Sequence, residues 1–328
     1  MTYNKFFSHI YAEDGVWEYA AAEAIRAAFS DSIVVPVRHY KDVFCKKGQD
    51  FDKQKNSPKL ILAIKQSSFY YSGSEMCDSF GHSNFIYTSE IMNCLYNCEY
   101  CYLRGMYPSA NIVVFVNQED TFKAIERVLP AYICVSYDTD LLSLEYLTGF
   151  VRNWMNFCKC HPGAEIEVRT KSAAFKYIKD IPSLSNVTLS WTLSPDLVIS
   201  RFEKGTPTLV TRLLNMQAAM DRGWNVRMCI DPIVKFSGWR DAYKEMAAVI
   251  RNKIDLDCLF DISIGAFRLP SDIYRKMLKF AHYSELLAYP MNEIDGGMWY
   301  VDDIEIVRYV NERLQGRDHL VAPRHPAK

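Results

Sequence analysis

Residues 187–231 read VTLSWTLSPDLVISRFEKGTPTLVTRLLNMQAAMDRGWNVRMCID. This stretch begins and ends with largely apolar runs, at 187–193 and 225–231, which have the length and side-chain content of buried strands. Between them, 207–221 has the length and apolar spacing of a helix. Two strands joined by a helical connection predict a parallel β-α-β unit.

The same alternation runs through most of the chain. Further strands are predicted at 84–88, 111–117, 132–137, 165–170 and 260–267, and further helices at 119–129, 143–158 and 239–252. Repeated units of this kind predict an α/β fold, a partial (β/α)6-type TIM barrel, with a doubly wound parallel sheet as the alternative. In both folds the chemistry lies where the strands end. The polar residues that follow the predicted strands are Asp138, Thr139, Asp140, Lys171, Ser194 and Asp231.

The first part of the chain differs from this pattern. Residues 1–83 combine a helical segment at 16–29 with strand-like segments at 32–40 and 59–67. They predict an N-terminal α/β cap that precedes the barrel, which we place at 84–282.

The last part, 283–328, is predicted to be a C-terminal extension. The sequence DGGMWYVDD at 295–303 is typical of a tight hairpin, because glycine readily adopts the backbone angles that such turns need. A helix is predicted at 303–315, followed by a tail.

Composition limits the class of protein. The chain has 328 residues, of which 49% are hydrophobic and 23% charged, and its formal net charge is −1. These values are typical of a globular protein and exclude a strongly basic nucleic-acid clamp. No segment approaches the roughly 18 to 20 apolar residues of a membrane span, and the acidic residues near the N-terminus do not fit a signal peptide. We therefore expect a cytoplasmic protein with no membrane partner. Nothing in the sequence indicates an oligomeric state.

Three of the ten cysteines lie within eight residues, in the sequence Asn93-Cys94-Leu-Tyr-Asn-Cys98-Glu-Tyr-Cys101-Tyr102. In a reducing compartment such clustering favours metal binding or catalysis over disulfides. A zinc site needs a fourth ligand, but the 30 residues after Cys101 contain neither histidine nor cysteine. Three thiolates without a fourth favour a [4Fe–4S] cluster with one open iron, and a structural zinc or a redox pair is the alternative.

This C-x3-C-x2-C pattern, with an aromatic residue before its last cysteine, resembles the motif of the radical S-adenosylmethionine superfamily. A narrower resemblance, to the spore photoproduct lyase family, extends over roughly residues 58–240. It is carried by KLILAIKQSSFYYSG, NCLYNCEYCYLRGMYPSANIVVFVN, SYDTDLLSLEYLTGF, VRTKSA, LSPDLVISRFEKGT and PIVKFSGW, which occur in that family's order and spacing.

The resemblance implies that Cys94, Cys98 and Cys101 bind the cluster and that its open iron holds S-adenosylmethionine. Reduction by an external one-electron donor, such as flavodoxin or ferredoxin, would then yield a 5′-deoxyadenosyl radical. By position in the family, Tyr100 would lie beside the adenine, and it would relay the radical back to the cofactor together with Tyr102. The residues that would hold the methionine end of the cofactor are Thr139, Lys171 and Thr192.

One departure from the family concerns the hydrogen-atom donor. Bacillus-type members carry a donor cysteine in the segment where this chain has Tyr137. Cys134 lies three residues earlier, and an odd offset along a strand turns it to the opposite face, so we expect a buried structural thiol there. Cys77, in a loop among Ser, Glu and Asp, is the donor that we favour, and Tyr137 is the alternative catalytic candidate for quenching the thymine radical.

A second departure concerns the hairpin. The family uses basic and aromatic residues there to hold a flipped lesion, whereas this hairpin offers Trp299 and Tyr300 for stacking and no arginine. Because phosphate neutralisation supplies much of the affinity for DNA, the near-zero net charge weakens the prediction of duplex binding. The basic residues that would compensate are Arg268, Arg275, Lys276 and Lys279.

The resemblance implies repair of 5-thyminyl-5,6-dihydrothymine in DNA by hydrogen-atom abstraction. The alternatives are an enzyme of the same family with a different substrate and a metal-bearing binding module without catalysis. Asp231 is predicted, from its place after a strand, to contact the ribose of the cofactor or the substrate.

Overall fold

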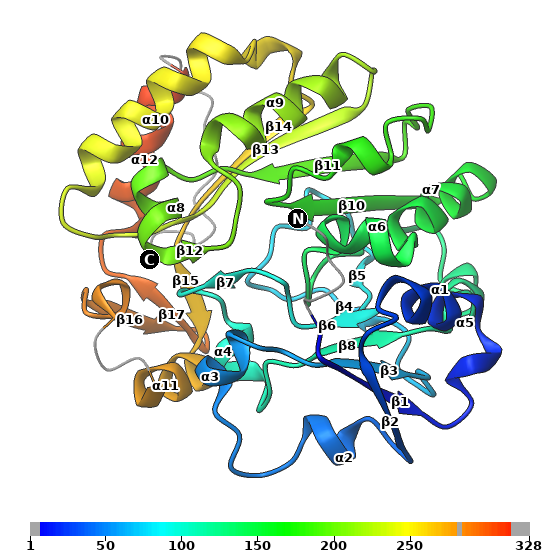
Figure 1. Ribbon diagram of the computed structural model, residues 1–328. Coiled ribbons are helices and arrows are strands. Elements are labelled where there is room, and N and C mark those ends of the chain that lie inside the picture. Colours follow the sequence, from blue (N-terminus) through cyan, green and yellow to red (C-terminus); the bar gives the residue numbers. More distant parts are fainter. Residues whose placement is uncertain (1–6, 281–283, 316–328) are drawn as a thin grey trace.

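The computed structural model describes residues 7–280 and 284–315. Two sheets lie side by side and share one continuous hydrophobic core, to which both contribute buried side chains such as Ile10 and Leu60 from one sheet and Ile133 and Leu189 from the other. The larger sheet curls, and helices cover its outer side (Figure 1).

The curled sheet is the predicted partial barrel. Its strands follow the order β14-β13-β11-β10-β9-β5-β4, and all neighbours are parallel except β4 and β5. The strands are β4 (Tyr71–Ser72), β5 (Phe85–Tyr87), β9 (Ala131–Cys134), β10 (Ala164–Thr170), β11 (Val187–Thr192), β13 (Asn225–Ile233) and β14 (Asp261–Ala266). Six parallel strands with outer helices confirm the predicted fold class.

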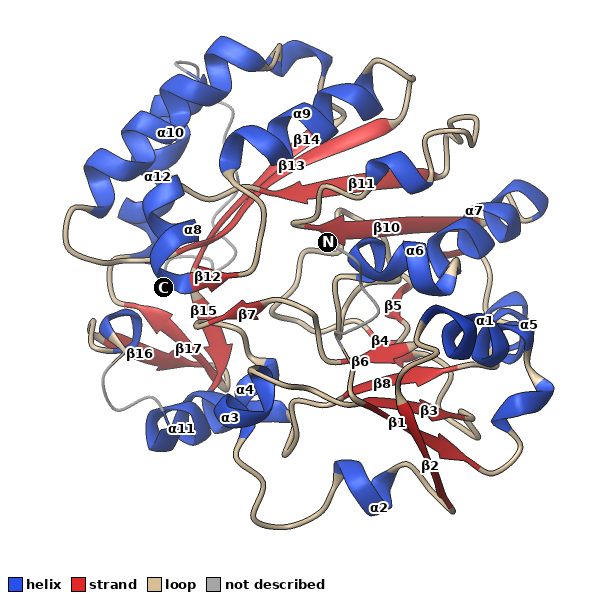
Figure 2. Cartoon of the chain, in the orientation of Figure 1, coloured by secondary structure: helices blue, strands red, loops and turns tan. Residues whose placement is uncertain are grey.

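The crossover helices explain why these strands are almost continuously apolar, because strands covered on both faces bury nearly every side chain. In β9 and β11 every residue is buried. Figure 2 shows the helices of this half on the outer side of the sheet. The helices of the barrel half are α5 (Gln118–Glu126), α6 (Glu145–Thr148), α7 (Phe150–Cys160), α8 (Asp196–Phe202), α9 (Leu209–Met220) and α10 (Trp239–Lys253).

The second sheet belongs largely to the predicted N-terminal cap. Its strand order is β2-β1-β3-β8-β6, with only the β6–β8 pair antiparallel. The strands are β1 (His9–Glu13), β2 (Ile33–Val37), β3 (Leu60–Ala63), β6 (Ile91–Met92) and β8 (Ile112–Phe115), and the helices are α1 (Ala20–Ala28), α2 (Lys41–Phe44), α3 (Phe51–Lys55) and α4 (Leu103–Met106).

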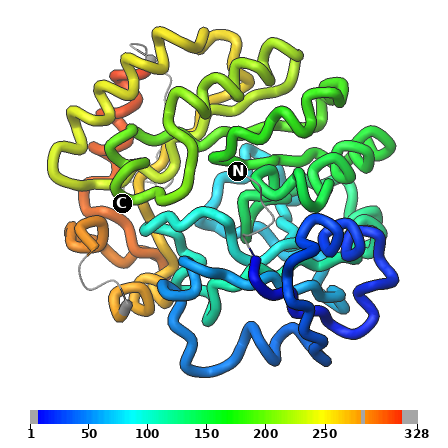
Figure 3. The backbone as a smooth tube through the Cα atoms, viewed as in Figure 1, coloured from blue at the N-terminus to red at the C-terminus, as the bar shows by residue number. Residues whose placement is uncertain are grey.

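The strand predicted at 111–117 forms, but its expected place in the barrel was wrong. It is β8, and it pairs with β3 of the second sheet. In the opposite direction, β4 comes from the cap segment and pairs with β5 of the barrel. The division between the sheets therefore does not coincide with the predicted boundary at residues 83 and 84. The cyan part of the tube in Figure 3 shows the chain passing between the two sheets.

The C-terminal hairpin and helix form as predicted. Strands β16 (Met291–Ile294) and β17 (Gly297–Tyr300) are joined by Asp295 and Gly296, which both have positive φ, as a tight two-residue turn requires. Strand β15 (Arg268–Pro270) adds to β17, so the hairpin continues directly from the barrel. The helices around it are α11 (Ser271–Phe280) and α12 (Asp303–Gln315), and a small two-stranded sheet elsewhere joins β7 (Asn97–Cys98) to β12 (Glu203–Lys204).

Within the described ranges, the structure contains no helix with both the length and the apolar character needed to cross a membrane.

Candidate active site

A cavity of about 300 Å³ lies at the C-terminal ends of the parallel strands, where the fold predicts chemistry. It is lined by strand ends, by the cysteine loop and by the loop before β5. The predicted site residues that line it are Cys77, Cys94, Cys98, Tyr100, Cys101, Tyr102, Tyr137, Thr139, Lys171, Thr192 and Asp231. The structure thus brings together residues separated by more than 150 positions. Trp299 and Tyr300 are not among the lining residues.

The cysteine loop is held by cations that bind its backbone. Lys55 Nζ donates to the carbonyl oxygens of Cys94 and Tyr96, at 2.6 and 2.9 Å, and Arg104 Nε donates to that of Cys98 at 3.1 Å. These contacts leave the three thiols free to face the cavity, and none of them is in a disulfide. Burial raises the pKa of the Cys94 thiol to about 11, so binding a metal there would release a proton.

This arrangement fits a cluster better than a single ion. No three His, Cys, Asp or Glu side chains among the described residues are grouped so that they could hold one metal ion. Three thiolates that bind separate irons of a cubane do not need to meet at one ion. Lys55 and Lys171 lie beside the loop and supply positive charge for an anionic cluster.

Thr139 and Lys171 form the cavity wall that the resemblance assigns to the cofactor. Thr139 Oγ1 is buried and has no hydrogen-bond partner among the described residues, which leaves it available to a ligand. Asp140 fixes the neighbouring backbone, because its carboxylate accepts from Lys171 N at 2.7 Å and from Ser143 N at 3.0 Å. The Lys171 ammonium lies 5.6 Å from the centre of the Tyr100 ring. The geometry fits a small zwitterion with a carboxylate near Lys171.

A buried network behind Tyr100 was not anticipated from the sequence. The Tyr100 hydroxyl donates to Glu203, which also accepts from Ser194 Oγ at 2.7 Å and pairs with fully buried Arg212. Arg212 in turn donates to the Thr192 carbonyl at 2.9 Å. The family-like segment LSPDLVISRFEKGT, which contains Glu203, could have indicated this network. The pairing of β7 with β12 brings Glu203 to the cysteine loop, and the local hydrophobic pattern does not predict that pairing.

Cys77, Tyr137 and Tyr102 form a second group of contacting residues in the same cavity. The Cys77 thiol donates to the Tyr137 hydroxyl at 3.8 Å. The Tyr102 hydroxyl donates to the Tyr137 carbonyl at 2.5 Å, and the two rings are 5.8 Å apart. Burial, followed by the influence of Cys77, raises the pKa of Tyr137, so its phenol keeps its proton.

The expectation for Cys134 was half right. It is buried, and burial raises its pKa to about 12, but it lines the same cavity as Tyr137. The strand predicted at 132–137 ends at Cys134, and a turn follows. The alternation of faces on which the expectation rested therefore does not extend to Tyr137.

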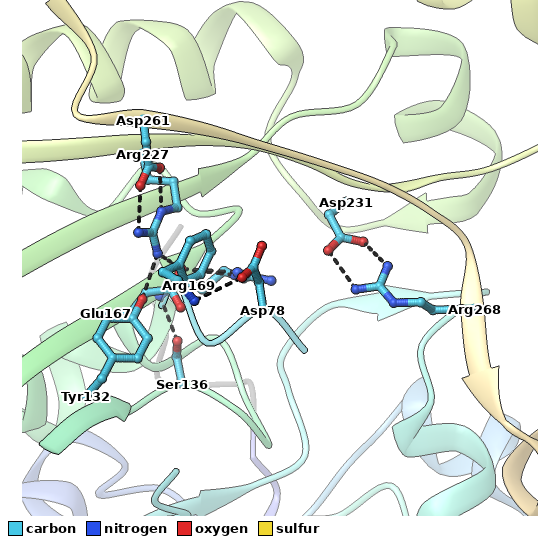
Figure 4. A network of polar contacts seen from close by, with 10 residues as sticks. Asp78, Tyr132, Ser136, Glu167, Arg169, Arg227, Asp231, Asp261 and Arg268 are labelled. Carbon is cyan, nitrogen blue, oxygen red and sulfur yellow. Dashed lines mark hydrogen bonds and ion pairs between the residues drawn. The ribbon is translucent and has the colours of Figure 1, made fainter. Parts of the chain in front are cut away.

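Charged residues inside the barrel form a network that sequence reasoning missed (Figure 4). Arg227 contacts Asp261 at 2.5 and 2.7 Å, Tyr132 at 2.6 Å and Glu167 at 3.2 Å. Glu167 also pairs with Arg169 at 3.1 Å, and both line the cavity. The alternating charges of 165–170 resemble a solvent-facing strand surface, whereas in a barrel that face points inward.

Asp231 lines the cavity, but its carboxylate is already engaged. Both of its oxygens accept from Arg268, at 2.7 and 3.0 Å, and both side chains are largely buried. Figure 4 shows this pair apart from the Arg227 network.

Trp299 and Tyr300 are core residues, with 6% and 1% of their surface exposed. The Tyr300 hydroxyl donates to the Leu286 carbonyl at 3.1 Å and accepts from Lys235 N at 3.3 Å. Neither ring offers an open face for stacking on a base. The expected basic compensation is also reduced, because Arg275 pairs with Glu293 at 2.9 Å and Lys276 with Asp272 at 3.4 Å.

The sequence matches the family described as spore photoproduct lyase over residues 9–290. It is similar to the spore photoproduct lyases of Geobacillus sp. (strain Y412MC61), with 23% identity over 180 residues, and of Bacillus subtilis (strain 168), with 20% over 177 residues. Each match covers 52% of this chain and 52% of the relative, so the chain spans about half the length of the curated relatives it matches.

Solved structures with the same fold span nearly the whole chain. A single-residue variant of spore photoproduct lyase superposes with a TM-score of 0.79 at 16% identity, covering 94% of this chain and 96% of that one. A double variant with bound AdoMet and dinucleoside spore photoproduct gives 0.76 at 17% identity, with 95% and 98% covered.

Proposed function

Since this chain belongs to the spore photoproduct lyase family, we propose that it is a radical S-adenosylmethionine lyase that reverts 5-thyminyl-5,6-dihydrothymine in DNA to two thymines. The observation that carries the proposal is the convergence of three free cysteines, the Lys171 ammonium and the Cys77 thiol on one cavity. The related double variant binds AdoMet and a dinucleoside spore photoproduct, the two ligands that this cavity would take together.

In this proposal Cys94, Cys98 and Cys101 hold a [4Fe–4S] cluster. When bound and reduced by an external one-electron donor such as flavodoxin or ferredoxin, the cluster and S-adenosylmethionine supply a 5′-deoxyadenosyl radical that abstracts a hydrogen atom from the lesion. Lys171 and Thr139 orient the methionine end of the cofactor. Tyr100 lies against the cysteine loop, and its hydroxyl is held by Glu203.

Cys77 then quenches the thymine radical that is left after the bond joining the two thymines of the lesion breaks. Its S–H bond breaks as a C–H bond forms on the thymine, which leaves a sulfur radical. Tyr137, 3.8 Å from the sulfur, returns a hydrogen atom, so that the S–H bond re-forms as the phenol O–H bond breaks. Tyr102, whose ring centre lies 5.8 Å from that of Tyr137, would together with Tyr100 restore the Tyr137 O–H bond, and the hydrogen atom would come from a C–H bond of the 5′-deoxyadenosine methyl group.

An anaerobic assay with a dinucleoside spore photoproduct, S-adenosylmethionine and dithionite tests the proposal. Thymidine released by the wild-type protein, and lost in Cys98→Ala, supports the lyase. 5′-Deoxyadenosine without thymidine would leave the radical chemistry intact and exclude this substrate.

A second candidate is an enzyme with the same cofactor and a different substrate. It is favoured by the hairpin, where Trp299 and Tyr300 are buried and the nearby Arg275 and Lys276 are paired with carboxylates. A substrate that is not a lesion in duplex DNA would not need unpaired positive charges at the hairpin.

A further inference from the structure

The Arg268 guanidinium ties together three parts of the chain. Its Nη1 and Nη2 donate to the two carboxylate oxygens of Asp231, at 2.7 and 3.0 Å. Its Nε donates to the Met76 carbonyl at 2.9 Å, one residue before Cys77. Arg268 itself begins β15 of the hairpin sheet. One side chain therefore links the end of β13, the hairpin and the loop that carries the thiol.

Two glycines leave the space that this arrangement needs. A Cβ atom added at Gly265 would lie 2.8 Å from both Arg268 Nη1 and Asp231 Oδ1. At Gly297 it would lie 2.8 Å from Trp299 Nε1 and 3.0 Å from Met76 Cε. Since real side chains do not approach so closely, a larger residue at Gly265 would displace the Arg268–Asp231 pair, and one at Gly297 would displace the Trp299 ring or the end of the Met76 side chain.

The far side of the same loop is anchored to the barrel. The Phe80 ring lies 3.2 Å from the Arg227 guanidinium carbon, and the His82 ring stacks on Tyr132 with ring centres 4.5 Å apart. Figure 4 also shows the Asp78 carboxylate directed at Arg169, and Met76 is a further point of attachment, through Arg268. Cys77 lies between these anchors, close to the Arg268 end.

We propose that Arg268, oriented by Asp231, is a positioning residue that fixes the Met76 backbone so that the Cys77 thiol faces the cavity beside Tyr137. The role of Cys77 as hydrogen-atom donor rests on the proposed function. The positioning of Cys77 by Arg268 does not. It gives a role to Asp231 that differs from contact with the cofactor. It also means that the hairpin sheet supports the hydrogen-atom donor, because Arg268 lies in β15 of that sheet and binds the backbone next to Cys77.

The physical reason is the narrow tolerance of hydrogen-atom transfer. A displacement of about 1 Å in a reacting group can cost about a hundredfold in rate. A thiol on a loop keeps its place only where the loop backbone is bound. A bidentate Arg–carboxylate pair gives the guanidinium a fixed direction, which its long side chain alone does not.

Alkylation of Cys77 tests the positioning without any lyase activity. The reconstituted protein is treated anaerobically with iodoacetamide, and the modified peptides are quantified by mass spectrometry, with exposed Cys160 as the internal reference. In Arg268→Gln we expect Cys77 to react about tenfold faster than in the wild type, because a hydrogen bond to a charged group is lost and the loop opens more often. An unchanged or slower rate overturns the proposal.

The matched control is Arg275→Gln. Arg275 also pairs with a carboxylate of the hairpin region, Glu293, but it is exposed and does not contact the loop. We expect it to leave Cys77 alkylation unchanged. Gly265→Ala perturbs the pair without removing the guanidinium, and it should raise the rate in the same direction as Arg268→Gln. If both control and test variants raised it equally, the effect would be general loosening and the proposal would fail.

A second measurement separates positioning from general damage to the enzyme. With the dinucleoside spore photoproduct, Arg268→Gln should accumulate at least as much 5′-deoxyadenosine as the wild type, because less of it is returned to the cofactor, and it should release about tenfold less thymidine per 5′-deoxyadenosine. Equal loss of both products would contradict a role at the donor. If neither variant nor wild type releases thymidine, the proposed function fails while the alkylation result still decides the positioning.

Discussion

The Cys77 sulfur lies 3.8 Å from the Tyr137 phenol oxygen, although the two residues are 60 positions apart. Tyr137 also stacks on Tyr87, with ring centres 4.1 Å apart. The family resemblance predicts that related enzymes carry a cysteine where this chain has Tyr137, and in this structure a thiol from another loop lies beside the Tyr137 phenol. The chain keeps a thiol at the cavity but supplies it from a different element.

Cys77→Ala should stop product quenching while hydrogen abstraction continues. We expect thymidine per 5′-deoxyadenosine to fall about tenfold or more, because among the described residues it is the Cys77 thiol that donates a hydrogen bond to the Tyr137 hydroxyl. Product ratios by chromatography give the measurement. Cys134→Ala is the informative counterpart, since Cys134 lines the same cavity. If Cys134→Ala and not Cys77→Ala lowered the ratio, the donor would be Cys134.

Tyr137→Phe removes the phenol O–H and keeps the ring that stacks on Tyr87. The first turnover should proceed, because the Cys77 S–H bond is still present. Later turnovers should fail, because the sulfur radical no longer recovers a hydrogen atom. Rapid-quench time courses with enzyme in excess and with substrate in excess separate the two phases. If Tyr137→Phe completed repeated turnovers at the wild-type rate, Tyr137 would be excluded from the relay.

Iron analysis tests the cluster ligands. Reconstituted wild-type protein should hold about four irons per chain, and Cys98→Ala should hold few, because three thiolates are the minimum that the open-iron cubane uses. Exposed Cys258 provides the control, since Cys258→Ala removes a thiol that lies outside the cavity. One zinc per chain and no iron in the wild type would exclude the radical mechanism.

A buried carboxylate should make stability depend on pH. Burial raises the pKa of Glu145 to about 7, although its carboxylate accepts from the backbone N–H groups of Val151 and Arg152. The folded state then holds a proton that the unfolded state releases above its lower pKa. Stability should therefore fall as pH rises from 4.5 to 7.5, by up to about 3 kcal/mol from this group.

Glu145→Gln should flatten this part of the pH profile. Urea unfolding at several pH values gives the free energies, and the difference between variant and wild type isolates the group. Equal slopes for both proteins would contradict the prediction.

Freeing a hairpin cation should improve binding to duplex DNA. Glu293→Gln removes the partner of Arg275, and we expect a higher, salt-sensitive affinity because one more phosphate contact becomes available. Titration of a labelled duplex at two salt concentrations measures it. Glu305→Gln, which frees Arg240, is the control on the outer helices. An equal gain in both variants would show a general charge effect.

The sequence predicted the strands well where burial on both faces makes them apolar, as in β9 and β11. It did not predict which strands would be neighbours, because an apolar run such as 111–117 has the same pattern whichever of the two sheets it joins. In the hairpin, Asp295 and Gly296 signalled the turn, but the burial of Trp299 depends on β15, which periodicity did not connect to it.

The site was predictable to the extent that residues are local or match a family pattern. The three cysteines share one loop, and Thr139 and Lys171 follow strands whose ends meet. The partners of these residues were not predictable. Glu203 contacts Tyr100 across 103 positions and Arg268 contacts Met76 across 192. Contacts between residues so far apart in sequence depend on the topology of the fold and not on the local pattern.

The path of the cysteine loop has a mechanical consequence. Cys94 follows β6 of the five-stranded sheet, whereas Cys98 lies in β7, which is hydrogen-bonded to β12 of the barrel half. A cluster bound to both cysteines would cross-link the two halves of the molecule. Because it binds only the folded arrangement, loading with iron should stiffen the junction, and oxidative loss of the cluster would loosen the protein where its two halves meet.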